Sequence, residues 1–122
     1  MNIGVLGENI AVRYLLCHKY RIIERNHREG FDEIDIIGVD FYGKLIFFEV
    51  KSLLIKNSHP NGFSPEDNFS LLKAGRVVRA CRKFVTKHPY LVEDDLGWQI
   101  DLIAISLKGL NSYDLRHYKN CI

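Results

Sequence analysis

Long apolar runs are missing from this 122-residue sequence, and none approaches the roughly 20 residues that a helix needs to span a bilayer. A secretory signal peptide is missing too, because Glu8 and Arg13 interrupt the apolar N-terminal stretch and no small-residue cleavage site follows. These absences argue against a membrane-spanning helix. They predict a protein of the cytoplasm that has no membrane partner.

Cysteine and histidine are too few and too scattered for a disulfide framework or a zinc site. The three cysteines, Cys17, Cys81 and Cys121, are odd in number and form no CxxC pair. The five histidines show no metal-ligand spacing. Cys17 and Cys81 instead fall at apolar positions of expected helices, so we expect both in the core.

Apolar and charged residues are present in the proportions of one ordinary domain, which we place over residues 1–122. The chain is 47% hydrophobic and 26% charged, so it can bury a core and has no disordered character. Its net charge of +2 is too small to indicate a partner. The distribution of charge along the chain is more informative.

Periodicity divides the chain into alternating helices and strands. The order of helix, three strands, helix, and one or two strands predicts an α/β fold with a mixed central sheet flanked by helices. A long loop, rich in Asn, Ser and Pro, is expected over residues 52–70. Helices are predicted at 3–18 and 70–88, and strands at 20–26, 33–40, 44–51 and 98–107, with a weak last strand near 113–118.

The run FFEVKS, residues 47–52, places an acid and a base inside an otherwise apolar strand. Side chains alternate across a strand, so Glu49 and Lys51 share one face. The same rule places Glu33 and Asp35 together on one face of the preceding strand. Two adjacent strands therefore carry charged faces.

The hairpin between these strands decides which residues meet. If its loop is residues 41–43, Asp35 lies opposite Glu49, with Cβ atoms about 4.5–5.5 Å apart. A change of one residue in loop length makes the pairing diagonal. Two carboxylates this close repel each other, so something positive is expected between them. Lys51 or a hard divalent cation such as Mg²⁺ meets this need, and both can be present together.

A cross-strand salt bridge is the alternative interpretation of these charges. It would join Asp35 or Glu33 to Lys51 at a solvated end of the sheet. Glu8 also leaves two interpretations open, because it falls in an apolar flank of the first helix. An acid there is either a surface residue or a site residue.

The second helix is strongly basic, with Lys73 and Arg76 near its start and no acid between Asp67 and Glu93. A basic helix is either a solvated face or a surface that contacts phosphates without reading sequence.

An acid on one strand followed by E-x-K on the next resembles the PD-(D/E)xK nuclease superfamily. The whole chain resembles the YraN family of small bacterial proteins, and the arrangement is similar to archaeal Holliday-junction resolvases. The matching segments occur in the expected order along nearly the whole chain: GENIAVRYL (7–15), RN (25–26), EIDII (33–37), FFEVKS (47–52), LLKAGRV (71–77) and IDLIAI (100–105).

The resemblance implies a restriction-endonuclease-like core of order αβββαβ and a metal-dependent nuclease. Asp35 and Glu49 would ligate Mg²⁺ or Mn²⁺ with help from the backbone carbonyl of Val50. Lys51 would orient the attacking water or stabilise transition-state charge. Glu8 would be an accessory acid from the first helix.

Other implications concern the substrate. Glu33 matches a family position with no clear role. Lys73 and Arg76 would contact phosphates flanking the cleaved bond. The expected partner is nucleic acid, in the first place DNA, including branched or junction DNA. A homodimer is compatible with a resolvase-like enzyme, which cuts two strands.

Three positions depart from the family pattern. Asp32 stands where the family usually has Gly, and Leu53 where it often has Arg. QID, residues 99–101, stands where Arg-Phe-Asp is usual. The acids and the lysine are intact. Two alternatives to an enzyme stay open: a non-catalytic nucleic-acid-binding module on the same fold, and a protein-interaction scaffold.

Overall fold

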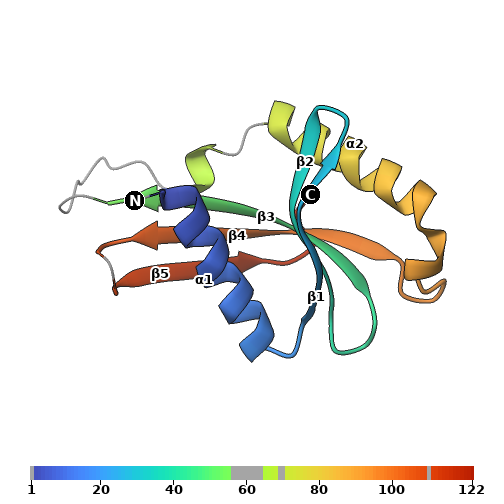
Figure 1. The fold of residues 1–122 in the computed structure, drawn as a ribbon, viewed down its shortest axis with the longest axis horizontal. Helices are drawn as coiled ribbons and strands as arrows, with labels where there is room; N and C mark the ends of the chain where they lie inside the picture. Colours follow the sequence, from blue (N-terminus) through green and yellow to red (C-terminus); the bar gives the residue numbers. More distant parts are fainter. Residues whose placement is uncertain (1, 56–64, 69–70, 110) are drawn as a thin grey trace.

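The computed structural model describes residues 2–55, 65–68, 71–109 and 111–122, which fold around one five-stranded sheet (Figure 1). In chain order, its elements are α1 (Ile3–Cys17), β1 (Arg21–Glu29), β2 (Asp32–Val39), β3 (Leu45–Leu54), the short 3₁₀ helix η1 (Pro65–Asn68), α2 (Leu71–Lys87), the 3₁₀ helix η2 (Pro89–Leu91), β4 (Trp98–Leu107) and β5 (Tyr113–Tyr118). In the part of the chain described, no helix is both long and apolar enough to cross a membrane.

The sheet is mixed, and its strands lie in chain order from β1 to β5. Neighbouring strands are antiparallel except β3 and β4, which are parallel. The parallel pair needs a crossover connection, and α2 lies within it. The predicted α/β class with a mixed central sheet and the predicted element order αβββαβ are therefore confirmed, and β5 lies where the weak last strand was expected.

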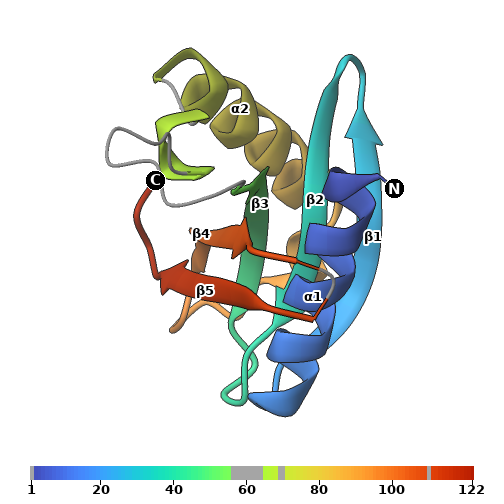
Figure 2. The ribbon, with the colours of Figure 1, turned by 90° about the vertical axis from the view of Figure 1, so that its left-hand side faces the viewer.

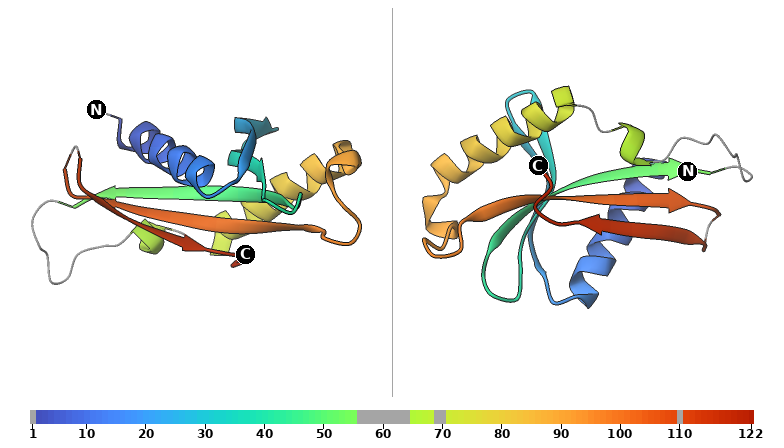
Figure 3. Two further views of the ribbon diagram at one scale, coloured as in Figure 1. Left: turned by 90° about the horizontal axis from the view of Figure 1, so that it is seen from below. Right: turned by 180° about the vertical axis from the view of Figure 1, so that it is seen from behind.

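The two long helices cover opposite faces of the sheet, as Figure 2 shows most plainly; Figure 3 gives two further views of the same ribbon. Each face has its own apolar core. Phe48 packs in the core under α1, whereas its neighbour Phe47 packs in the core under α2. Alternation along β3 therefore supplies both cores, which explains why this strand is apolar on both faces.

The ends of the helices follow from local chemistry. The Asn2 side chain caps α1 by accepting a hydrogen bond from the Val5 N–H at 3.1 Å. Helix α2 ends at Lys87, two residues before Pro89, which cannot continue a helix.

Cys81 is buried on α2 as expected. Cys17 is exposed, so its predicted core position is wrong; it is the last residue of α1 and lies beyond the packed turns.

The predicted loop over residues 52–70 needs correction at both ends. β3 continues to Leu54 because residues 52–54 pair with residues 105–107 of β4. Pro65–Asn68 forms η1, and residues 56–64 and 69–70 lie outside the described residues.

Ionic contacts fix η1 against β5. Glu66 accepts hydrogen bonds from Arg116 Nε at 2.6 Å and from the Tyr118 hydroxyl at 2.7 Å. Hydrogen bonding from Arg116 lowers the pKa of Glu66 to about 2. The segment that leads into α2 is thus held by a charged contact to the last strand.

Gly7 allows α1 to approach β3 closely. A Cβ atom at this position would lie 2.7 Å from Ser52 Cβ, which is closer than real side chains pack. We expect Gly7→Ala to lower the free energy of unfolding by about 1–3 kcal/mol, the usual cost of overpacking. Denaturant unfolding of the purified variant measures it.

Gly75→Ala is the matched control on α2. A Cβ there meets nothing within 4 Å, so the gain in helix propensity should stabilise the protein by up to about 1 kcal/mol. Equal effects of the two substitutions would contradict close packing at Gly7.

Candidate metal and nucleic-acid site

The candidate site lies where β2 and β3 carry their acids. The ladder between them runs from Val39–Leu45 to Ile36–Phe48, and the Asp40 N–H donates to the Lys44 carbonyl at 3.0 Å. This register is the one that places Asp35 and Glu49 next in line. Beyond Ile36, a side chain replaces the backbone hydrogen bonding between the two strands: the Asp35 carboxylate accepts a hydrogen bond from the Val50 N–H at 2.8 Å.

Asp35 and Glu49 are close enough for their carboxyl groups to share a hydrogen bond. Burial, followed by the negative charge of Glu49, raises the pKa of Asp35 to about 8; the Val50 N–H and the Lys51 charge oppose the shift only in part. Glu49 is itself buried. Near pH 7 a proton therefore stands between two carboxyl groups that would otherwise repel each other.

Lys51 lies beside this pair, with Nζ 3.1 Å from Glu49 Oε1 and only 19% of its side chain exposed. Among the described ion pairs its partner is therefore Glu49 on its own strand. The alternative of a cross-strand bridge to Asp35 or Glu33 does not appear in the described part of the chain.

The basic start of α2 reaches the same place. The positive charge of Lys51 lowers the pKa of Lys73, which shows that the two ammonium groups are neighbours. Lys73 and Arg76 line a hollow of about 190 Å³ together with Glu49, Lys51 and Glu33. The structure thus brings together residues that the sequence had placed on a strand and on a helix.

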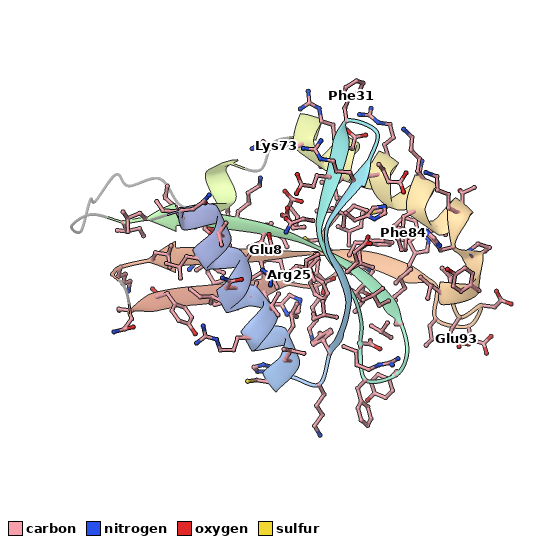
Figure 4. The ribbon with its side chains drawn as sticks, viewed as in Figure 1. Glu8, Arg25, Phe31, Lys73, Phe84 and Glu93 are labelled. Carbon is pink, nitrogen blue, oxygen red and sulfur yellow. The ribbon has the colours of Figure 1, made fainter. Side chains whose placement is uncertain are left out.

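Glu8 borders a second hollow, of about 330 Å³, together with Asp35, Glu33 and Val50. Its carboxylate accepts hydrogen bonds from Arg25 Nε at 2.9 Å and from Asn26 at 3.1 Å; Figure 4 shows Glu8 and Arg25 side by side. Glu8 is therefore not a free surface acid: its carboxylate is held by two side chains of β1 at the edge of this hollow. Glu33 is exposed and lines both hollows.

Asp35 and Glu49 are the side chains best placed to hold a cation. Across residues 2–55, 65–68, 71–109 and 111–122, no three His, Cys, Asp or Glu side chains gather in a group that could hold a metal. A cation at this pair would take its other ligands from the Val50 carbonyl, water and phosphate. That donor set suits Mg²⁺, which keeps several waters and uses one or two carboxylates.

Sequence reasoning gave no role to three residues that the structure places here. Arg25 and Asn26 hold Glu8, and the only signal was their presence in the matched segment RN. The carboxylate of Asp32, which stands where the family usually has glycine, accepts hydrogen bonds from Nε and Nη2 of Arg79, at 2.8 and 2.9 Å. The departure at Asp32 thus joins β2 to α2.

Comparisons with known proteins agree in naming one family. The profile of the uncharacterised protein family UPF0102 matches residues 7–105. A UPF0102 protein of Prosthecochloris aestuarii is 33% identical over 123 residues, covering 95% of this chain and 89% of that protein. One from Persephonella marina is 35% identical over 117 residues, covering 96% of this chain and 90% of that protein.

Among solved structures, Pyrococcus furiosus SfsA in complex with Ca²⁺ aligns with 92% of this chain at 18% identity and a TM-score of 0.41. The chain spans 60% of the length of that SfsA chain. A likeness this distant says nothing about function. Because the family profile and the UPF0102 relatives cover most of its length, the chain belongs to the uncharacterised protein family UPF0102, the YraN family that its motifs resemble.

Proposed function

We propose that this protein is a metal-dependent nuclease that hydrolyses phosphodiester bonds of nucleic acid, in the first place DNA. One observation carries the proposal: the carboxyl groups of Asp35 and Glu49 share a hydrogen bond, and the Lys51 ammonium group, which lines a basic hollow together with Glu49, lies 3.1 Å from Glu49 Oε1. A purely structural acid pair is costly in a sheet, since close like charges destabilise it. If a cation replaces the proton between Asp35 and Glu49, the two carboxylates act as its ligands and no longer repel each other.

In this mechanism Asp35, Glu49 and the Val50 carbonyl hold Mg²⁺ or Mn²⁺. The ion supplies Lewis-acid polarisation of a phosphate oxygen and lowers the pKa of a bound water. Lys51 orients the attacking water or places its positive charge where negative charge builds up in the transition state. Burial of these groups strengthens their electrostatic interactions.

Other residues around the two hollows support binding. Lys73 and Arg76 contact phosphates that flank the cleaved bond, which gives affinity without sequence preference. Glu8 and Glu33 line the larger hollow beside Asp35, and their negative charges favour a cation there. Branched or junction DNA and a homodimer remain part of the proposal through the family resemblance alone.

Chelator-sensitive cleavage is the test of the proposed activity. The protein is incubated with single-stranded, duplex and four-way-junction DNA, and with RNA, in Mg²⁺ or Mn²⁺ and in EDTA. We expect metal-dependent cutting that is lost in EDTA, in Asp35→Ala and in Lys51→Ala. Equal background cutting by all three proteins on every substrate would contradict an enzyme. Salt-dependent binding without cutting would favour the non-catalytic module, and the absence of both would favour a scaffold.

Lys73→Ala should weaken DNA binding by about three- to tenfold for all sequences alike. The reason is that a phosphate contact adds affinity independent of sequence, and its loss lowers the salt dependence of log K by about one. Fluorescence anisotropy at several salt concentrations, on two unrelated sequences, measures both quantities. Lys44→Ala, in the hairpin connection just before β3, is the matched control and should leave binding unchanged. A loss confined to one sequence would contradict a phosphate role.

A further inference from the structure

Phe31 projects a complete aromatic ring into solvent at the tip of the β1–β2 hairpin. Its relative exposure is 104%, the highest among the large apolar residues exposed in the described chain. Gly30, before it, adopts a φ of +64°, which few other residues would tolerate in this turn. The turn is therefore shaped to present this side chain outward.

The hairpin beneath Phe31 is held firmly to α2. On one strand, buried Glu29 accepts one hydrogen bond from Lys87 at 2.8 Å and is contacted by His27 at 2.8 Å. On the other strand, Asp32 receives both hydrogen bonds of the Arg79 fork. Each residue flanking the Gly30–Phe31 turn is thus ion-paired with α2. These ion pairs hold the backbone that carries the Phe31 ring against the helix.

Phe31 lies at the mouth of the candidate site. It lines the same hollow as Glu49, Lys51, Lys73 and Arg76. Figure 4 shows its side chain above the hairpin and close to Lys73 at the start of α2. An exposed ring next to cations can bind two parts of one nucleotide, since the cations attract its phosphate and the ring stacks on its base.

Two other exposed aromatic residues behave differently. Phe41 and Tyr42, in the β2–β3 turn, pack edge-to-face against each other with ring centroids 5.5 Å apart, and Lys19 lies 5.5 Å over Phe41. Among the described residues, Phe31 has no such ring or cation partner. Its ring is therefore free to stack on a partner from outside the chain.

We propose that Phe31 is a base-stacking residue that gives the site a preference for nucleic acid with unpaired bases. The inference rests on the proposed function, because it assumes that a nucleic-acid strand enters the hollow. Bases inside a duplex already stack on one another, whereas a base in a single strand, flap or junction presents a free face. Phe31 would stack on such a base while Lys73 and Arg76 hold the adjacent phosphates.

The test compares a single-stranded oligonucleotide with its duplex, each carrying one 2-aminopurine as a fluorescent base. Binding is measured in EDTA, so that no cleavage intervenes, for the wild type, Phe31→Ala and Phe31→Trp. Phe41→Ala is the matched control, because it removes another exposed ring far from the hollow. Phe31 is fully exposed, so its variants should fold normally.

We expect Phe31→Ala to lower single-strand affinity about tenfold, equivalent to about 1.4 kcal/mol, and duplex affinity less than twofold. Phe31→Trp should retain affinity, and the 2-aminopurine emission should change on binding to the wild type and Phe31→Trp but not to Phe31→Ala. Phe41→Ala should match the wild type. Unchanged single-strand affinity in Phe31→Ala, an equal loss on both substrates, or no binding by the wild type would overturn the inference.

The same variants separate this inference from the proposed activity. If the wild type cuts DNA with metal and Phe31→Ala binds single strands normally, the nuclease stands and the stacking role fails. If binding depends on Phe31 but no metal-dependent cutting occurs, the stacking role stands and the nuclease fails.

Discussion

Asp35→Asn should raise the free energy of unfolding of the metal-free protein by up to about 5 kcal/mol at pH 8, because one pKa unit corresponds to about 1.4 kcal/mol and the pKa of Asp35 is raised by about four units. The folded state holds Asp35 at a pKa of about 8, against an ordinary value of 3.8. Asparagine keeps the shape and needs no proton. Its oxygen can accept the Val50 N–H, and its amide can donate to Glu49.

The stability difference between Asp35→Asn and the wild type should depend on pH. The raised pKa means that Asp35 stabilises the fold fully below about pH 4, and that this stabilisation is lost as the pH rises towards 8. The advantage of Asp35→Asn should therefore grow between pH 4 and pH 8. Urea unfolding in EDTA at several pH values measures it, with the exposed Asp94→Asn as a control that should show no such trend.

Divalent metal should stabilise the wild type far more than it stabilises Asp35→Asn. A ligand present at 100 times its Kd stabilises the folded protein by about 2.7 kcal/mol, and asparagine removes a charged ligand. Saturating Mn²⁺ should therefore stabilise the wild type and leave Asp35→Asn almost unchanged. A variant that is less stable than the wild type in EDTA would indicate instead that Asp35 is a satisfied structural acid.

Lys51→Met should reduce metal-dependent cleavage by about 10²–10³-fold, the usual cost of removing one group that stabilises transition-state charge. Methionine keeps the length of the buried stem without the charge. Metal binding should persist or become tighter, since Glu49 loses the ammonium group 3.1 Å away that competes with a cation. Single-turnover cleavage and Mn²⁺ titration calorimetry separate the two effects.

Lys44→Met is the control for Lys51→Met, because Lys44 lies on the β2–β3 hairpin connection at the opposite end of β3. It should cleave at the wild-type rate. Loss of Mn²⁺ binding together with cleavage in Lys51→Met would contradict a role in the transition state and indicate damage to the metal site.

The register of the β2–β3 hairpin could be predicted from the sequence because it depends on local features. The three-residue loop and strict alternation determine which residues pair, and the ladder from Val39–Leu45 to Ile36–Phe48 confirms that register. The partner of Lys51 was less predictable. Both Glu49 and the acids on β2 are within reach of a long flexible side chain, and only the packed structure selects Glu49.

Contacts between distant parts of the chain escaped prediction. Asp101 was noted only within the segments QID and IDLIAI, with no partner assigned to it. It is completely buried, lies 2.7 Å from His117 Nε2 and accepts the Asn120 N–H at 2.8 Å, so it ties the C-terminal segment to β4. Arg25 and Glu8 likewise meet from different elements. Periodicity reports which face a residue occupies, but not which residue of another element it meets.

Anomalous diffraction from a Mn²⁺-soaked crystal is the most direct test of a divalent-cation site formed by Asp35 and Glu49. We expect one manganese peak between the two carboxylates, with the Val50 carbonyl among its ligands, and no such peak in Glu49→Gln. A crystal with no manganese there, or with manganese bound only at Glu8 and Glu33, would contradict it.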